Sequence, residues 1–190
     1  MKVGILGFQG GIEEHERMLH SLGVDTHRVR YVQDLAKIDA LILPGGESTT
    51  MGVFLRDSGL LAPLRETIEG GMPTLATCAG LILLAQEVEG KTFASVGLLP
   101  IAVQRNAYGR QRESFTTELL LSFDPARPYP GVFIRAPRIE RILSPEIQTL
   151  SLYEGQPVMV EYGKIIGCTF HPELTEDPRV HEYFLSFAGL

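Results

Sequence analysis

Hydrophobic and polar positions alternate with two different periods along the first half of the chain. Short apolar or alternating runs predict strands, and longer runs with apolar residues three or four positions apart predict helices. The predicted strands are 2–7, 24–31, 39–43 and 73–77, and the predicted helices are 12–22, 51–56, 61–69 and 81–87. Gly10-Gly11 breaks the first strand and Gly23 closes the first helix. This alternation predicts a mostly parallel sheet covered by helices on both faces.

The pattern changes after about residue 95, where β-type runs dominate. The predicted strands there are 98–104, 115–122, 131–135, 147–153, 157–162 and 164–170, followed by a helix over 179–188. That helix can place Val180, Tyr183, Phe184 and Phe187 on one side. We therefore expect a three-layer α/β fold, with a mostly parallel central sheet flanked by helices and an antiparallel extension in the second half. We find no repeat and no clear linker, which favours one domain over residues 1–190.

Composition excludes some classes of function. The hydrophobic share of 44% is ordinary for a globular protein with a substantial core. A net charge of −6 without a long basic run argues against nucleic-acid binding. Apolar stretches such as 81–85 are far too short to span a bilayer, and residues 1–7 lack a signal-peptide pattern. The two cysteines have different contexts, which favours a reducing cytoplasm over a disulfide scaffold, with Cys168 packed inside a strand.

The first candidate for chemistry is Cys78, which ends a short β-type run. The small residues Ala79 and Gly80 follow, and then an apolar helical run begins. This is the pattern of a nucleophile elbow, in which a sharp turn lifts the side chain out of the sheet. A helix N-terminus also favours the thiolate. A buried structural cysteine is the alternative, and this segment alone leaves the two interpretations balanced.

Two further segments could complete such a site. The β-type run 164–170 is followed by His171 and, two residues later, by Glu173. A nucleophilic thiol needs a base, and the base needs a third group that orients it. The apolar strand 39–43 is followed by Pro44 and then by Gly45-Gly46, whose backbone could aim an N–H at an oxyanion. We expect Ser48 or Thr49 to cap the next helix. The alternatives are a loop histidine with a solvated glutamate, and an ordinary strand-to-helix turn.

Together these segments resemble the class I (triad) glutamine amidotransferases, and most closely the branch of glutaminase subunits of pyridoxal 5'-phosphate synthase. The cysteine and His-x-Glu motifs are typical of the superfamily, and the remaining motifs are typical of the branch. The motifs that carry the resemblance are Gly7-Phe8-Gln9-Gly10, residues 44–51, Thr77-Cys78-Ala79-Gly80, residues 104–111, residues 131–137 and residues 170–177. The stretches 87–95 and 139–155 are the least similar to the family.

The resemblance implies a role for each site residue. Cys78 would attack the glutamine carboxamide, His171 would move the protons, and Glu173 would orient His171. Backbone N–H groups of Gly46 and Ala79 would hold the oxyanion, and no metal or organic cofactor is needed. The expected substrate-binding residues are Glu47, Gly46, Ser48, Arg105, Ile134, Arg135 and Ala136. Arg110, Arg112 and Arg138 are expected at an interface or in solvent. The remaining histidines, His15, His20, His27 and His181, are expected to be structural or exposed.

Ammonia production implies a partner that consumes ammonia. The resemblance implies a pyridoxal 5'-phosphate synthase subunit, a (β/α)8 barrel, in a large hetero-oligomer. Gln9 and Gly10 are similar to the region that couples docking to activation, and we expect Gln9 to adjust the oxyanion turn. Three alternatives stay open: a glutaminase of another pathway, such as imidazole glycerol phosphate synthesis; a cysteine peptidase or chaperone-like protein; and a non-catalytic subunit. The partner that binds would distinguish the first alternative. The His-x-Glu motif and the pair of Glu47 and Arg105 argue against a peptidase. The intact set of Cys78, His171 and Glu173 argues against a non-catalytic subunit.

Overall fold

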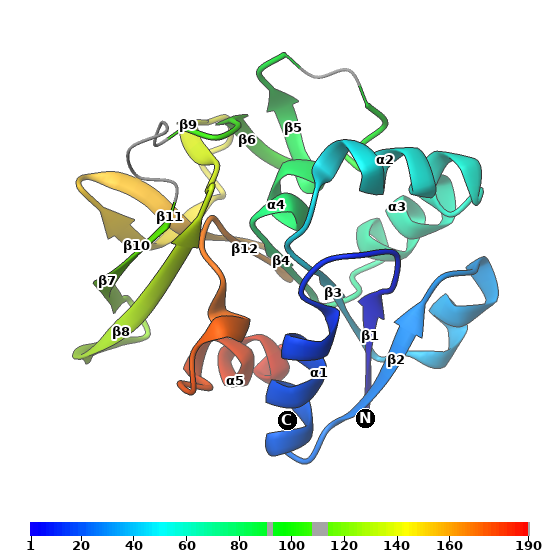
Figure 1. Ribbon diagram of the computed structural model, residues 1–190, viewed down its shortest axis with the longest axis horizontal. Coiled ribbons are helices and arrows are strands. Elements are labelled where there is room, and N and C mark those ends of the chain that lie inside the picture. The colour runs from blue at the N-terminus through cyan, green and yellow to red at the C-terminus, as the bar shows by residue number, and fades with distance from the viewer. Residues whose placement is uncertain (91–92, 108–113, 190) are drawn as a thin grey trace.

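The computed structural model describes residues 1–90, 93–107 and 114–189. Its main sheet has seven strands in the order β10-β11-β12-β4-β3-β1-β2 (Figure 1). The parallel part consists of β1 (Lys2–Leu6), β2 (Asp25–Val29), β3 (Ala40–Leu43), β4 (Thr74–Thr77) and β12 (Ile165–Cys168). The strands β10 (Gln148–Tyr153) and β11 (Gln156–Tyr162) add an antiparallel edge. The expected mostly parallel sheet with an antiparallel extension is confirmed.

Helices cover both faces of this sheet, which confirms the expected three layers (Figure 1). One face packs against α1 (Ile12–Ser21) and α5 (Arg179–Ser186), and the other packs against α2 (Ser48–Asp57), α3 (Leu61–Glu69) and α4 (Ala79–Leu84). Strand β3 shows why its sequence is apolar throughout. Successive side chains of a strand point to opposite faces, so Ile42 joins the core under α1 while Leu41 and Leu43 join the core under α4.

The second half of the chain adds two smaller sheets. One has three strands in the order β5-β6-β9, formed by β5 (Ala85–Val88), β6 (Leu99–Gln104) and β9 (Arg138–Ile142). The other is the antiparallel pair β7 (Ser114–Leu121) and β8 (Asp124–Ile134). Tyr129 and Phe133 of β8 enter the same core as α1 and α5. This pair therefore packs against the main sheet and brings the end of β8 towards it.

Several predicted elements differ from the structure. The helix predicted over 81–87 ends at Leu84, because residues from Ala85 pair with β6 instead. The strand predicted over 131–135 begins at Asp124 and runs through three prolines, which an edge strand of a two-stranded sheet tolerates. Strand β9 and the 3-10 helices η1 (Val32–Lys37) and η3 (Pro172–Leu174) have no predicted counterpart. Across the described residues, every helix is too short or too polar to cross a bilayer.

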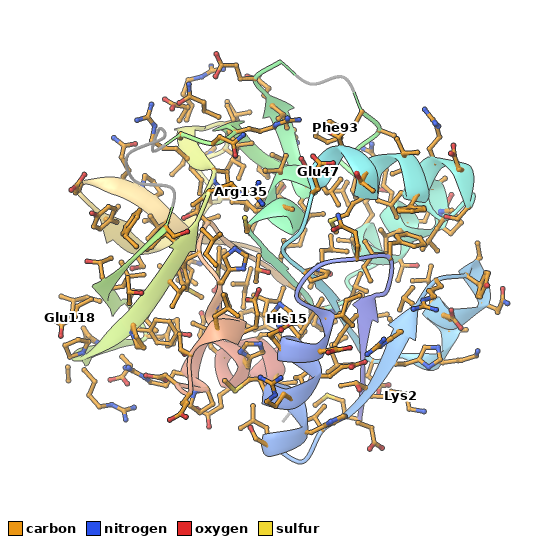
Figure 2. The ribbon with its side chains drawn as sticks, viewed as in Figure 1. Lys2, His15, Glu47, Phe93, Glu118 and Arg135 are labelled. Atoms are coloured by element: carbon orange, nitrogen blue, oxygen red, sulfur yellow. The ribbon has the colours of Figure 1, made fainter. Side chains whose placement is uncertain are left out.

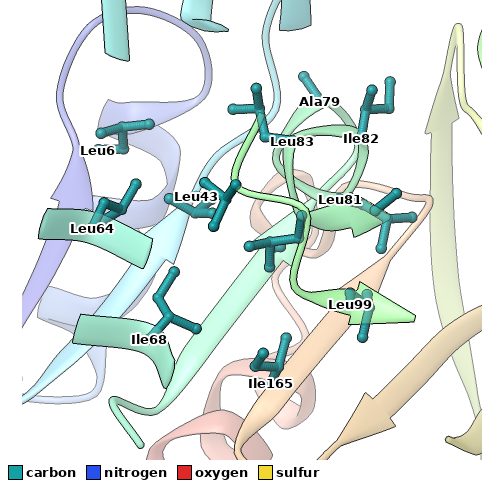
Figure 3. Packing of buried hydrophobic residues seen from close by; sticks show 14 of the residues in the cluster. Leu6, Leu43, Leu64, Ile68, Ala79, Leu81, Ile82, Leu83, Leu99 and Ile165 are labelled. Atoms are coloured by element: carbon teal, nitrogen blue, oxygen red, sulfur yellow. The ribbon is translucent and has the colours of Figure 1, made fainter. Parts of the chain in front are cut away.

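Gly80 allows α4 to lie directly against β3. A Cβ at this position would be 2.0 Å from the carbonyl oxygen of Leu43, which is backbone and cannot rotate away. Leu43, Ala79 and Leu81 surround this contact in the core (Figure 3). We predict that Gly80→Ala lowers the free energy of unfolding by about 1–3 kcal/mol, because overpacking forces the helix away from the sheet. Urea unfolding would measure this, and an unchanged midpoint would contradict the packing argument.

Candidate active site

A cavity of about 480 Å³ lies where four parallel strands end. The strands β1, β3, β4 and β12 run in the same direction, so their carboxyl ends share one edge of the sheet. The carboxyl edge of an open α/β sheet is the usual place for a ligand site. Most of the predicted site residues line this cavity: Gln9, Gly10, Gly46, Glu47, Ser48, Cys78, Ala79, Arg105, Ile134, Arg135, His171 and Glu173. Ala136 does not, and it is 1% exposed.

Cys78 occupies a strained turn between β4 and α4. Its φ of 47° and ψ of −102° are unusual for a residue with a side chain. The turn is anchored on both sides, because Cys78 N–H donates to Cys168 O at 2.9 Å and Gly80 lies against Leu43. The thiol sulfur is 3.9 Å from Ile134 O at the end of β8. The fold thus holds the sulfur at the cavity wall, with 6% of the residue exposed.

His171 and Glu173 form a buried pair at the end of β12. Nδ1 of His171 is 2.7 Å from Oε1 of Glu173. The backbone N–H of His171 donates to Val132 O at 2.8 Å, which ties this segment to β8. Two glycines make room for the pair, because a Cβ at Gly45 would be 2.4 Å from Cε1 of His171 and a Cβ at Gly11 would be 2.9 Å from Oε1 of Glu173. The sequence gives no sign that Gly11 and Gly45 are needed for this space.

The charges of this pair support each other. Burial alone would lower the pKa of His171, but its interactions with Cys78 and Glu173 outweigh burial and raise the pKa to about 10. Burial would raise the pKa of Glu173, but His15 and His171 lower it below its ordinary value. Nε2 of His171 makes no regular hydrogen bond to any residue that the structure describes. The arrangement favours an imidazolium that is paired with a carboxylate and faces a thiol.

The loop after β1 is locked to the turn after β3. Gly11 N–H donates to Gly45 O at 3.1 Å, and Nε2 of Gln9 donates to Glu47 O at 3.0 Å. Gly10 has a φ of +102°, and a Cβ there would be only 1.7 Å from Gly45 O. Glycine is therefore required at position 10 both for its backbone conformation and for the close approach. Any displacement of this loop would move the Gly45-Gly46 turn.

Glu47, rather than Ser48 or Thr49, caps α2. Its carboxylate accepts hydrogen bonds from the N–H of Thr49 at 3.1 Å, and from both the N–H and the hydroxyl of Thr50 at 2.7 Å. The cap prediction was wrong because it considered only the residue types that lead the N-cap statistics, whereas the longer glutamate side chain folds back here. Ser48 is 4% exposed and lines the cavity from the first position of the helix.

Arg105 lies beside the same helix end. Its Nη1 donates to Oγ1 of Thr49 at 3.3 Å, and its guanidinium lies 5.6 Å from the ring centre of Phe93. Glu47, at the start of α2, and Arg135, just after β8, both line the cavity (both are labelled in Figure 2). Arg135 has a φ of 42°, so the end of β8 is a second strained point of the cavity wall. Opposite charges thus approach the cavity from different elements.

Several other residues considered in the sequence do not line this cavity. Cys168 is fully buried, and burial raises the pKa of its thiol, in keeping with the expected packing role. Arg138 pairs with Glu140, His20 contacts Thr26 and His27 contacts Asp34. The predicted motif residues 108–111, and with them Arg110 and also Arg112, lie outside the described residues. Within the described ranges, no group of three or more histidine, cysteine or acidic side chains is arranged to hold a metal ion.

His15 and His181 lie beside the pair of His171 and Glu173. Both are fully buried, and Nε2 of His15 is 3.4 Å from Oε2 of Glu173. The sequence predicts structural or exposed positions for both histidines. No spacing rule could have paired residues 166 positions apart on two helices that show no motif.

Glu47 should make the start of α2 sensitive to acid. Burial would raise its pKa, but the hydrogen bonds from Thr50 and Thr49 lower it from 4.5 to about 2. A lowered pKa stabilises the folded state fully above pH 4.5, and this stabilisation is lost as the pH falls through 2. We predict that Glu47→Gln lowers the free energy of unfolding by about 1 kcal/mol near neutral pH. The difference from the wild type should shrink on acidification, and a pH-independent difference in urea unfolding would contradict it.

The chain is similar to known proteins over nearly its whole length. A sequence model of the SNO glutamine amidotransferase family matches residues 5–188. The chain is 48% identical over 185 residues to the pyridoxal 5'-phosphate synthase subunit PdxT of Thermotoga maritima, covering 97% of this chain and 98% of the relative. It is 47% identical over 193 residues to the PdxT of Pyrococcus furiosus, with coverage of 97% and 98%. A crystal structure described as a glutamine amidotransferase superposes with a TM-score of 0.93 at 43% identity, covering 99% of each chain.

Proposed function

Because this chain belongs to the SNO glutamine amidotransferase family and is an enzyme that acts on the amide group of glutamine, we propose that it hydrolyses L-glutamine to L-glutamate and ammonia for pyridoxal 5'-phosphate synthesis. The name of its PdxT relatives supports the pathway, at 45–48% identity over nearly the whole chain. The observation that carries the reaction is the 2.7 Å contact between His171 and Glu173 in the cavity that also holds Cys78. We propose that residues 1–190 act as one glutaminase domain.

The proposed reaction begins at the sulfur of Cys78. The thiolate attacks the amide carbon of glutamine, and His171 holds the thiol proton and then gives it to the leaving nitrogen, which departs as ammonia. The acyl group remains on the sulfur as a thioester. Water then attacks the thioester, with His171 taking the water proton and returning it to the thiolate. Glu173 orients His171 through Nδ1 and stabilises the imidazolium, which the raised pKa of His171 supports.

The tetrahedral oxyanion would bind to backbone N–H groups. We propose Ala79, the residue after the nucleophile, and Gly46, in the turn that Gly10 and Gln9 brace. Both residues line the cavity, and they follow the parallel strands β3 and β4, whose carboxyl ends share one edge of the sheet.

The amino-acid end of glutamine needs a partner for each charge. We propose Glu47 for the α-ammonium and Arg105 for the α-carboxylate, because the two side chains meet the same helix end through Thr49. Glu47 accepts three hydrogen bonds, and a carboxylate has about four acceptor sites, so one remains for the ammonium. The remaining proposed contacts are Ser48, Ile134, Arg135 and Ala136. Ala136 is buried and does not line the cavity, so its proposed contribution is indirect.

A glutaminase of this kind needs a consumer for its ammonia. We propose a synthase subunit with a (β/α)8 barrel, assembled with this chain in a large hetero-oligomer. Both cysteines are free thiols, which favours the reducing cytoplasm as the place of the complex. Glutamate release would be measured with the chain alone and with the synthase subunit. Release that rises with the partner supports the proposal. Release without any effect of the partner contradicts the pathway, and no release in either case contradicts the glutaminase.

Gln9 is proposed to transmit docking to the oxyanion turn. Its side chain donates to Glu47 O and lies within about 3 Å of where a Cβ of Gly46 would be. We predict that Gln9→Ala lowers the activation by the synthase subunit by about 10-fold, a typical size for coupling between sites. Gln33→Ala, at an exposed position of η1, is the matched control and should not change activation. Unchanged activation of Gln9→Ala would show that Gln9 does not couple docking to the turn.

A further inference from the structure

A second layer of buried polar groups lies behind Glu173. His15 on α1 and His181 on α5 are each 0% exposed (Figure 2 labels His15). Nε2 of His15 is 3.4 Å from Oε2 of Glu173, and Nδ1 of His15 is 2.9 Å from Nε2 of His181. Oε2 of Glu173 has no regular hydrogen-bond partner in the described part of the chain. The same Nε2 is also 3.4 Å from Oγ1 of Thr77, so His15 stands between this buried oxygen and a buried hydroxyl.

The hydrogen atoms can be assigned by counting donors and acceptors. If His15 carries its proton on Nε2, it points a donor at Glu173, and its Nδ1 accepts from Nε2–H of His181. Nδ1 of His181, which makes no hydrogen bond, is then a bare acceptor. The opposite tautomer would let the Thr77 hydroxyl donate to Nε2 of His15, but it would bury an unpaired N–H on His181 and turn a lone pair of His15 towards the carboxylate. The first assignment is favoured because an N–H attracts the Glu173 carboxylate, whereas a lone pair repels it.

The charge of His15 agrees with this assignment. Burial lowers the pKa of His15, and the nearby His171 lowers it as well, whereas Glu173 and Glu14 raise it by less in sum. Burial and His15 also lower the pKa of His181, to about 3, against the opposing effect of Glu173. Both shifts favour the neutral imidazole. A neutral His15 can donate to Glu173 without competing with the His171 imidazolium for its charge.

We propose that His15 is a positioning residue that holds the Glu173 carboxylate in place through Nε2, with its tautomer set by His181. This inference rests on the proposed glutaminase function. Attraction to Nε2–H of His15 keeps Oε2 on the α1 side, so Oε1 stays 2.7 Å from Nδ1 of His171, whose imidazole interacts with Cys78. Without His15, Oε2 would lose this buried polar contact, and the carboxylate would gain freedom to rotate. With His15 included, the proposed triad extends to a fourth side chain on α1.

The test compares two replacements of similar size. His15→Gln keeps an N–H donor close to the position of Nε2, whereas His15→Leu removes it. We expect His15→Leu to lower kcat for glutamine by about 10- to 100-fold, the range seen when the outer partner of a metal-bound histidine is lost. We expect KM to change little and His15→Gln to recover most of kcat. His20→Leu, on the same helix but exposed, is the matched control.

A second readout does not depend on glutamine. Alkylation of Cys78 by iodoacetamide reports the thiolate, and the fully buried Cys168 is protected from it. If Glu173 is loosened, the imidazolium is less stable, and His15→Leu should be alkylated about 10-fold more slowly than the wild type at the same pH. Equal behaviour of His15→Gln and His15→Leu in both assays would overturn the proposal. A wild type that alkylates normally but releases no glutamate would instead contradict the proposed function alone.

The tautomer can be measured without any mutation. Long-range nitrogen–proton correlation NMR of histidine-labelled wild-type protein distinguishes a proton on Nε2 from one on Nδ1. A proton on Nε2 of His15 supports the proposal, and a proton on Nδ1 overturns it, whether or not His15→Leu folds. The signal of His15 is assigned from its absence in His15→Gln.

Discussion

Replacing Cys78 with alanine is expected to lower glutamine hydrolysis by at least about 10⁴-fold, the scale on which loss of a nucleophile acts. No other described side chain at the cavity offers a sulfur, because Cys168 is fully buried behind Cys78. The replacement removes one atom and keeps the strained turn, which is anchored by the backbone of Cys78 and by Gly80. The folded structure should therefore survive. Glutamate release in the presence of the synthase subunit is the measurement, with far-UV circular dichroism as the check on folding.

Cys168→Ala is the matched control for this prediction. It removes the same atom from a fully buried position in β12, so it should cost about 1 kcal/mol of stability through a small cavity. Its backbone carbonyl, which accepts from Cys78 N–H, is retained, so turnover should be close to that of the wild type. Turnover that persists in Cys78→Ala would refute the nucleophile assignment. Equal losses in the two variants would point to the packing of the strands instead.

Replacing Gly10 with alanine is expected to lower kcat by about 100-fold or more without unfolding the protein. The new Cβ would lie 1.7 Å from Gly45 O, so the loop after β1 and the Gly45-Gly46 turn must separate. That turn carries a proposed oxyanion donor, Gly46, and packs against His171 through Gly45. Loss of one oxyanion donor alone costs about 10²–10³-fold in kcat. Steady-state glutamine hydrolysis with the partner present would measure the effect.

Gly23→Ala separates this clash from backbone strain. Gly23 has a φ of +73° but no atom within 4 Å of where a Cβ would be. Alanine there imposes strain of about 1 kcal/mol or slightly more, without displacing a neighbour. Its stability should fall while its kcat stays close to that of the wild type. If Gly10→Ala kept full activity, the close approach of the two loops would have no part in catalysis.

Local chemistry explains which parts of the fold could be predicted. Strand β3 is apolar on both faces because it is buried on both, and the helix predicted over 61–69 has the bounds that α3 has. The prediction failed at residues 85–88, where helical periodicity continues but the backbone pairs with β6. It also failed at Arg138–Ile142, where a charged edge strand depends on the same partner. In both places a neighbouring strand outweighs local preference.

The candidate site shows the same division. Cys78, His171 and Glu173 could be singled out because each follows a strand in a short, chemically suggestive segment. The N-cap at Glu47 could not, since three donors from the following residues draw its carboxylate back. The roles of Gly11 and Gly45 could not either, because each depends on how closely a distant side chain approaches.

By itself the sequence determined the layered α/β class, the position of the turn at Cys78 and the His-x-Glu segment. These features depend on residues within one element, where the period of burial and the size of a side chain act locally. The tertiary structure alone decided which segments meet at the cavity and that His15 and His181 stand behind Glu173. Contacts between α1, α5 and η3 depend on how helices pack across one face of the sheet. Packing is a property of the whole core, and no short segment encodes it.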